Sequence, residues 1–259
     1  MRTLHSADGT KIAFDQTGQG PPVILIVGAF NDRSTGQPLA EALESQLTVL
    51  NYDRRGRGAS GDTQPYAVER EIEDLDALIR QAGGAARVFG YSSGAHLALA
   101  AAAHGLNITK LALYDAPFIV GDDVPRPPKD IAVQLAKLIS SNRRGDAVEL
   151  YQTRLVGIPE QVVVQLRHAP FRPALEAIAH TLVYDATLIG DLRLPMAQLQ
   201  SIQAPTLAIY GSESPALMGP AAKALAEALP DCHVRALDGQ SHDIVPMALA
   251  PVLLEFFGE

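Results

Sequence analysis

A serine occupies the centre of the pentapeptide Gly90-Tyr91-Ser92-Ser93-Gly94, which has the pattern G-x-S-x-G. An apolar run at 86–89 precedes it and a stretch of small residues at 95–102 follows it. This order predicts a strand, a sharp turn and a helix, the arrangement called a nucleophile elbow. Glycine on both sides suits so tight a turn, because any larger side chain beside the serine would clash. Ser92 is therefore the predicted nucleophile.

A serine hydroxyl is a weak nucleophile unless a base lies within hydrogen-bond reach and an acid orients that base. Among the seven histidines, His242 fits this role best because it lies in the polar loop 238–243, directly after the apolar run 233–237. Open α/β sheets place their sites in loops at the carboxyl ends of strands. His242 is the predicted base. The remaining histidines are interpreted as structural: His5, His96, His104, His168, His180 and His233.

Attack on a carbonyl also requires donors for the negatively charged oxygen that forms, and backbone amides are sufficient. The amide of Ser93 is one candidate, since it begins the helix after the nucleophile. The second candidate is Ala29, in the loop that follows the apolar run 23–27. The sequence therefore predicts an oxyanion hole formed by the amides of Ala29 and Ser93.

The order of apolar and amphipathic stretches indicates how these residues are positioned. Continuous apolar runs are typical of strands covered on both faces, and they lie at 23–27, 47–52, 87–89, 111–114, 206–210 and 233–237. Helical patterns fall between or after them, near 37–46, 67–81, 94–104, 217–229 and 246–257. Two short strands near 2–5 and 11–16 predict an N-terminal hairpin. The alternation predicts an α/β fold with a mostly parallel central sheet flanked by helices.

Residues 118–204 interrupt this alternation, with four or five amphipathic helical stretches, prolines between them and no strand pattern. We interpret them as a helical lid inserted after the sixth core strand, which leaves a core domain of residues 1–117 and 205–259. Lids over clefts commonly gate substrates. The alternative is that the insertion only covers an edge or a face of the sheet.

The features above are accompanied by the segment D-x-R-G-x-G-x-S, matched by Asp53, Arg55, Gly56, Gly58 and Ser60. Over nearly the whole chain, their order resembles the α/β-hydrolase fold family. The resemblance implies a serine-nucleophile enzyme of the esterase or lactonase type, with no metal and no organic cofactor. In that family the D-x-R-G-x-G-x-S segment is a structural turn, so we assign it no catalytic role.

Residues 56–61 within this turn also match G-x-G-x-x-G, the pattern of a dinucleotide site. Such a site requires a helix that opens at the glycines and an acidic residue about 20 positions later. Here a loop follows at 62–65 and Gln81 occupies the place of the acid. A nucleotide cofactor is therefore not expected.

The sequence departs from the family pattern at two places. Val27 precedes Gly28 where many members have histidine, but a backbone amide does not depend on that side chain. The second departure concerns the acid, which the family commonly carries in G-x-x-D after the penultimate core strand. This chain has Ser214 at that position. Serine cannot stabilise an imidazolium by charge, and loss of the acid in a related triad costs about 10,000-fold in kcat.

Two carboxylates are candidates to replace the missing acid. Asp115 directly follows the run 111–114 at a strand end, and we favour it because a strand end holds a side chain rigidly. Glu213 is the alternative, one residue short of the usual place. Asp243 ranks third, because it would have to fold back on its neighbour. Asp185 in the lid is interpreted as a surface or substrate-facing residue.

The expected activity is hydrolysis of a small, fairly apolar ester, thioester or lactone through an acyl-enzyme. Four residues adjoin the motifs and are predicted to line an apolar pocket: Phe30, Tyr91, Phe118 and Met218. The same machinery also supports carbon–carbon bond hydrolysis, acyl transfer or cofactor-free peroxidation. The missing G-x-x-D acid motivates a further alternative, a ligand-binding protein with a vestigial site.

Composition restricts the partners and the compartment. The net charge is −8 and no long basic run is present, so nucleic acid is not expected as a partner. Cys232 is the only cysteine, which excludes an intramolecular disulfide and a cysteine-cluster metal site. The chain shows no secretory signal and no apolar run near the roughly 18 residues of a membrane span. We expect a soluble, cytoplasmic protein with a small-molecule substrate; its oligomeric state is not indicated.

Overall fold

A single eight-stranded sheet forms the centre of the computed structural model, which describes residues 1–121 and 124–258. Its strand order is β1-β2-β4-β3-β5-β6-β7-β8. β1 (Arg2–His5) and β2 (Lys11–Thr17) form the expected hairpin, and β2 pairs antiparallel with β4. All other pairs are parallel: β3 (Pro22–Ile26), β4 (Thr48–Tyr52), β5 (Ala86–Tyr91), β6 (Ile108–Tyr114), β7 (Thr206–Gly211) and β8 (Cys232–Leu237). The predicted mostly parallel α/β fold is confirmed.

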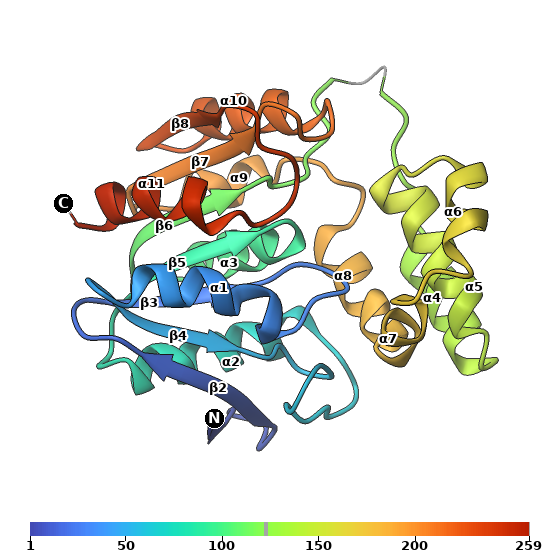
Figure 1. Ribbon diagram of the computed structural model, residues 1–259, viewed down its shortest axis with the longest axis horizontal. Coiled ribbons are helices and arrows are strands. Elements are labelled where there is room, and N and C mark those ends of the chain that lie inside the picture. Colours follow the sequence, from blue (N-terminus) through green and yellow to red (C-terminus); the bar gives the residue numbers. More distant parts are fainter. Residues whose placement is uncertain (122–123, 259) are drawn as a thin grey trace.

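Helices cover both faces of this sheet (Figure 1). α1 (Arg33–Leu43) and α11 (Pro246–Gly258) pack on one face, where Val23 and Leu25 of β3 point. α2 (Val68–Gln81), α3 (Ser93–Ala103) and α10 (Met218–Ala228) pack on the other, where Ile24 and Ile26 point. Because successive strand residues point to opposite faces, burial on both sides requires the continuous apolar runs seen in the sequence.

α1 begins at Arg33, four residues earlier than the hydrophobic pattern suggested. The reason is a helix N-cap, since the side chain of Asp32 accepts a hydrogen bond from the backbone N–H of Ser34. This bond satisfies one of the unpaired N–H groups at the start of the helix. The Asp32 N-cap thus extends α1 into a polar segment that carries no hydrophobic signal.

The predicted helical insertion lies between β6 and β7 and extends to one side of the sheet (Figure 1). We call its first five α-helices the cap helices: α4 (Ile131–Ser140), α5 (Arg144–Tyr151), α6 (Glu160–Leu166), α7 (Arg172–Ala177) and α8 (Leu182–Ile189). A π-helical segment (Gln152–Val156) follows α5, and a short 3-10 turn (Ala179–Thr181) precedes α8.

The cap helices bury a hydrophobic cluster of their own, with Leu135 and Leu182 fully enclosed. The loop after β3 reaches this cluster through Ala29 and Phe30, so the cap and the core are in contact there. α9 (Met196–Leu199) behaves differently, because Leu199 is buried together with the side chains of α2 and α3. None of the helices in the described ranges has the length and apolar character needed to cross a bilayer.

Leu135→Ala should weaken the cap helices selectively. Leu135 is fully buried in the cap cluster, and a leucine-to-alanine change in a packed core costs about 2 to 5 kcal/mol. Hydrogen exchange followed by mass spectrometry should show faster exchange over 131–151 and 182–189, with peptides from β5 unchanged.

The matched control is Leu39→Ala, an equally buried leucine of α1 in the cluster on one face of the sheet. It should accelerate exchange in α1 and β4 and leave the cap helices protected. Equal acceleration in both regions by both variants would show that the cap and the core do not pack independently.

Candidate active site

The turn between β5 and α3 holds Ser92 in an unusual backbone conformation, with φ of 55° and ψ of −124°. The two glycines of the motif make this turn possible. A Cβ on Gly90 would lie 2.7 Å from the Cα of Ala95, and one on Gly94 would lie 2.4 Å from the carbonyl oxygen of Ile26. Real Cβ atoms do not approach backbone so closely, so only glycine lets the strand, the turn and the helix pack in this way. The elbow presents Ser92 at the carboxyl edge of the sheet.

The structure brings the predicted nucleophile, base and acid together in one chain of contacts. His242 Nε2 lies 3.3 Å from Ser92 Oγ, and His242 Nδ1 lies 2.9 Å from Asp115 Oδ2. The Asp115 side chain is fully buried, whereas that of His242 is 33% exposed. The acid is thus shielded from water while the base stays accessible to a small molecule.

Ser214 contacts Asp115 from the loop that follows β7, the strand next to β6. Its Oγ donates a hydrogen bond of 2.6 Å to Asp115 Oδ2, and the N–H of Gly211 donates one of 3.2 Å to Oδ1. Glu213 is exposed, and no hydrogen bond within the described ranges joins it to His242. The serine at the family's usual acid position therefore binds the acid that reaches His242 from β6.

Two backbone donors beside Ser92 are available to a ligand. Within residues 1–121 and 124–258, the N–H groups of Ala29 and Ser93 donate to no acceptor. The loop after β3 packs directly on the nucleophile, because a Cβ on Gly28 would lie 2.8 Å from the Cβ of Ser92. Ser93 is the first residue of α3, where the helix dipole adds partial positive charge. These are the two amides predicted for the oxyanion hole.

A cluster of buried charges underlies this region. Arg54 donates to Glu71 through two bonds of 2.7 Å and to Asp185 Oδ1 at 2.8 Å. Arg57 donates to Asp185 Oδ2 at 2.5 Å. All four side chains are at most 2% exposed. Although burial by itself raises the pKa of Asp185, the guanidinium groups of Arg57 and Arg54 outweigh it and lower that pKa, which keeps the carboxylate ionised.

The position of Asp185 differs from the sequence-based expectation. The surface interpretation is wrong, because Asp185 on α8 is completely buried where this cap helix meets the core. Its partners lie about 130 positions earlier in the chain, so no local pattern identifies them. The one available signal was a single charged residue in the otherwise uncharged helix 182–189.

Two of the residues expected in the pocket lie near the cap or the triad residues. Phe30 is half-buried, and its ring centroid lies 5.3 Å from that of Tyr151 on α5. The Tyr91 ring is 5.0 Å from the His242 ring. Met218 is buried at the start of α10.

Phe118 lies in a different environment. It is buried, and its ring is 4.2 Å from that of His96 on α3. Both residues line a cavity of about 300 Å³. Burial lowers the pKa of His96 to about 4, and its Nε2 lies 3.0 Å from the carbonyl oxygen of Pro117. His96 is therefore a neutral structural histidine at pH 7.

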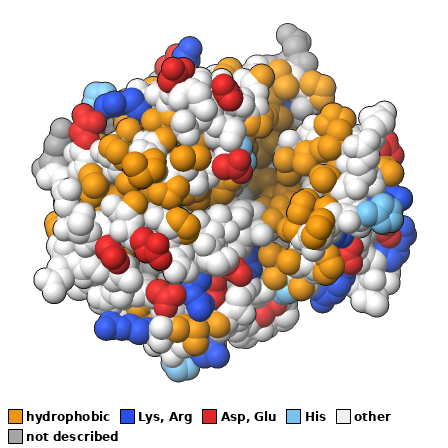
Figure 2. Space-filling view, viewed as in Figure 1, with side chains coloured by type: hydrophobic (Ala, Val, Ile, Leu, Met, Phe, Trp, Pro, Cys, Tyr) orange, Lys and Arg blue, Asp and Glu red, His pale blue; other side chains and the backbone are white. Residues whose placement is uncertain are grey.

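An apolar cleft separates the cap helices from the core. Figure 2 shows a hollow between the two, with hydrophobic side chains along its walls. A cavity of about 720 Å³ lies between them, lined on the core side by residues 215–217, which directly follow Ser214. Residues 153–157 line it from the cap. The cleft is large enough for a small organic molecule.

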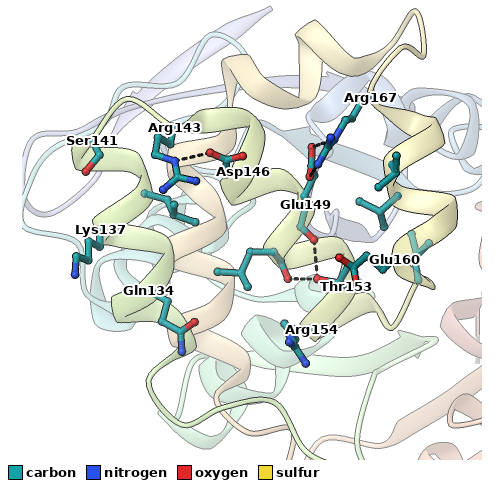
Figure 3. Close-up of a pocket in the computed structure, with 15 residues that line it drawn as sticks. Gln134, Lys137, Ser141, Arg143, Asp146, Glu149, Thr153, Arg154, Glu160 and Arg167 are labelled. Carbon is teal, nitrogen blue, oxygen red and sulfur yellow. Dashed lines mark hydrogen bonds and ion pairs between the residues drawn. The ribbon is translucent and has the colours of Figure 1, made fainter.

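A second cavity, of about 770 Å³, lies within the cap between α4, α5 and α6 (Figure 3). Charged side chains surround it, and two of its ion pairs join Arg143 to Asp146 and Arg167 to Glu149. None of the predicted site residues lines this cavity, and none lines the apolar cleft, although Leu217 beside Met218 and Ile119 beside Phe118 do. Over the described ranges, no group of three or more His, Cys, Asp or Glu side chains is arranged to hold a metal ion.

Comparison with known proteins places this geometry in a family. The family model described as "Alpha/beta hydrolase family" matches residues 23–253. The crystal structure of an alpha/beta hydrolase from Sphaerobacter thermophilus is 52% identical, covers 99% of this chain and 100% of its own, and superposes with a TM-score of 0.92.

Two further similarities are weaker. An enol-lactonase from Burkholderia xenovorans has a TM-score of 0.73 at 22% identity, over 100% of both chains, and so shares the fold. The uncharacterized hydrolase YraK of Bacillus subtilis is 34% identical over 95 residues, which is 35% of each chain. The chain thus matches about a third of YraK's length.

Moving the carboxylate from position 115, after β6, to position 214, after β7, should preserve part of the reactivity of Ser92. We expect Asp115→Asn to slow the labelling of Ser92 by a fluorophosphonate probe by about 10,000-fold, as loss of the acid does in a related triad. Ser214→Ala, which removes only one hydrogen bond to a charged group, should slow labelling by about tenfold. The double variant Asp115→Ser, Ser214→Asp should label at least tenfold faster than Asp115→Asn.

Glu213→Gln is the control for this series and should label like the wild type. A severe loss in Glu213→Gln together with normal labelling of Asp115→Asn would assign the acid to Glu213 instead.

Proposed function

Because the chain belongs to the alpha/beta hydrolase family, we propose that it is a serine hydrolase acting on a small, fairly apolar ester, thioester or lactone. The observation that carries this proposal is the continuous chain of contacts from Asp115 through His242 to Ser92. Unpaired amides of Ala29 and Ser93 lie beside it, as acyl transfer requires.

In the first half of the reaction, Ser92 Oγ attacks the acyl carbon while His242 Nε2 accepts the hydroxyl proton. The negative charge that develops on the carbonyl oxygen is stabilised by the N–H groups of Ala29 and Ser93. Asp115 accepts a hydrogen bond from His242 Nδ1–H and stabilises the imidazolium. His242 then gives its proton to the leaving alcohol, thiol or lactone oxygen as its bond to the acyl carbon breaks.

In the second half, water replaces the leaving group. His242 removes a proton from the water, the hydroxyl oxygen attacks the acyl carbon, and the same two amides bind the second oxyanion. Collapse of this intermediate breaks the bond to Ser92, which recovers its proton from His242. A lactone gives a single hydroxy acid as product, whereas an ester gives an acid and an alcohol.

The apolar cleft beside the Ser214 segment supports a small hydrophobic substrate. We assign Phe30, Tyr91 and Met218 to the substrate pocket, and residues 118–204 to a lid over the core formed by 1–117 and 205–259. Phe118, also expected in the pocket, is not assigned to it because its ring packs on His96 beside a separate cavity. The Burkholderia protein, which has the same fold, is an enol-lactonase, and this supports including lactones among the candidate substrates.

A binding protein with a vestigial site explains these contacts less well. That alternative was motivated by the serine at position 214, but the contact between Asp115 and His242 supplies a carboxylate from another strand. A protein that only binds a ligand has no chemical need for this contact. The serine hydrolase is therefore the better-supported function.

Hydrolysis of p-nitrophenyl butyrate tests the proposal directly. Ser92→Ala and His242→Ala should each lower kcat by about a million-fold, as the corresponding losses do in a related serine hydrolase. His104→Gln, at the end of α3, is the control and should retain activity. Circular dichroism should verify that each variant is folded. If the wild type neither turns over any ester of a panel nor reacts with a fluorophosphonate, the proposed function is wrong.

Phe30→Ala and Met218→Ala should change which acyl chain is preferred. Removing a side chain that contacts a methylene changes the specificity ratio by about 10-fold or more, so the ratio of kcat/KM for butyrate over acetate esters should shift. Phe171→Ala, which removes a phenylalanine that is 50% exposed before α7, should leave that ratio unchanged. An unaltered ratio in both pocket variants would remove these residues from the substrate pocket.

A further inference from the structure

Arg57 holds the peptide group that carries one of the two oxyanion donors. Its Nη1 donates a hydrogen bond of 2.6 Å to the carbonyl oxygen of Gly28 and one of 3.2 Å to that of Asn31. The carbonyl of Gly28 and the N–H of Ala29 belong to the same planar trans peptide and point in opposite directions. Fixing this carbonyl therefore also fixes the direction of the Ala29 N–H. A charged donor on the carbonyl further polarises the peptide and strengthens its N–H as a donor.

Asp185 connects Arg57 to the second donor residue. Its Oδ2 accepts the 2.5 Å bond from Arg57, and its Oδ1 accepts a hydrogen bond of 2.7 Å from the hydroxyl of Ser93. The backbone N–H of Ser93 is the other predicted oxyanion donor. The Asp185 carboxylate is thus hydrogen-bonded to Arg57, which fixes the Ala29 amide, and to Ser93, which carries the second amide.

The balance of charges supports a positioning role for this cluster. Arg54 and Arg57 contribute two positive charges, and Glu71 and Asp185 contribute two negative ones. All four groups are buried and paired with each other, so no net charge is left to attract an anionic ligand. Such a cluster is costly to desolvate, and breaking one buried partner is strongly unfavourable, so its geometry is well defined.

We propose that Arg57 and Asp185 are positioning residues of the oxyanion hole, through which α8 of the cap fixes the amides of Ala29 and Ser93. The inference rests on the proposed function, because it concerns the same hole. Arg57 acts through the Gly28 carbonyl that it holds, and Asp185 acts through the side chains of Arg57 and Ser93. We expect their loss to affect the transition state, in which the oxyanion exists, far more than the ground-state complex.

The variant Arg57→Met tests this role. Methionine retains an apolar stem, and Asp185 keeps Arg54 and Ser93 as hydrogen-bond partners, although the cluster is left with one excess negative charge. Arg55→Met is the matched control, two positions earlier in the same turn. Arg55 is equally buried but pairs with Asp74 and Asp8, and none of its hydrogen bonds reaches the loop after β3 or α3.

Two inhibitors separate an effect on the oxyanion from an effect on the fold. A butyl trifluoromethyl ketone adds to the serine and places a negative oxygen in the hole, whereas the matching secondary alcohol only occupies the pocket. Removing one oxyanion donor lowers kcat by about 100- to 1,000-fold. For a misdirected donor we expect a smaller loss, about 10- to 100-fold, in both kcat and trifluoromethyl ketone affinity. KM for p-nitrophenyl butyrate and alcohol affinity should change less than twofold.

Three outcomes would overturn the inference. Arg57→Met could lose no more kcat or ketone affinity than Arg55→Met, or KM could rise and alcohol affinity fall together with the loss of kcat. The third outcome concerns Arg57 Nε–H, which has no acceptor within the described ranges. A rise in KM confined to carboxylate-bearing esters would make Arg57 a substrate-binding residue.

Arg57→Lys provides a second measurement if Arg57→Met does not fold. Lysine keeps the charge but cannot direct two nitrogens to Gly28 and Asp185 in the fixed geometry of a guanidinium. It should show the same selective loss of ketone affinity. The proposed function itself fails only if the wild type shows no ester turnover and no adduct with the trifluoromethyl ketone. With an active wild type, the two arginine variants test the positioning role alone.

Discussion

The close packing of backbone around Ser92 is the constraint on which the rest of the site depends. Gly94 packs against the end of β3 and Gly90 against the start of α3, so the serine is held between the two with a positive φ. β5 lies in the middle of the sheet, between β3 and β6. Loops from the strands on both sides can therefore reach the same serine, one with a proposed oxyanion donor, the amide of Ala29, and the other with the proposed acid, Asp115.

The proposed acid comes from the loop after β6, whereas the family commonly has it in the loop after β7. β6 and β7 are neighbours, and both end at the edge of the sheet where His242 lies. A carboxylate after β6 and a hydroxyl after β7 thus meet at one point, and Ser214 donates to the oxygen of Asp115 that also contacts His242. The hydroxyl stabilises the carboxylate in place. The proposed triad therefore includes a carboxylate although the usual residue is absent.

The buried charges give the cap a second role besides covering a cleft. Asp185 comes from α8, whereas Arg54 and Arg57 come from the turn after β4, so their ion pairs join the cap to the core. A buried ion pair contributes little net stability because desolvation is costly, but it fixes one geometry. Hydrogen bonds from the same cluster reach Gly28 and Ser93. The cap is therefore anchored to the core beside the proposed oxyanion hole.

The sequence by itself determined the order of strands and helices and the tight turn at Ser92, because these follow from local periodicity and glycine spacing. It also led to the proposal of His242 and Asp115 as base and acid, because both lie in loops that follow strands. It could not determine the start of α1, which depends on a cap, or the partners of Asp185, which lie about 130 residues away. Only the tertiary structure decided that Ser214 supports the acid and that Arg57 holds the Gly28 carbonyl. Those contacts join segments that are distant in the chain, and no local pattern encodes their distances.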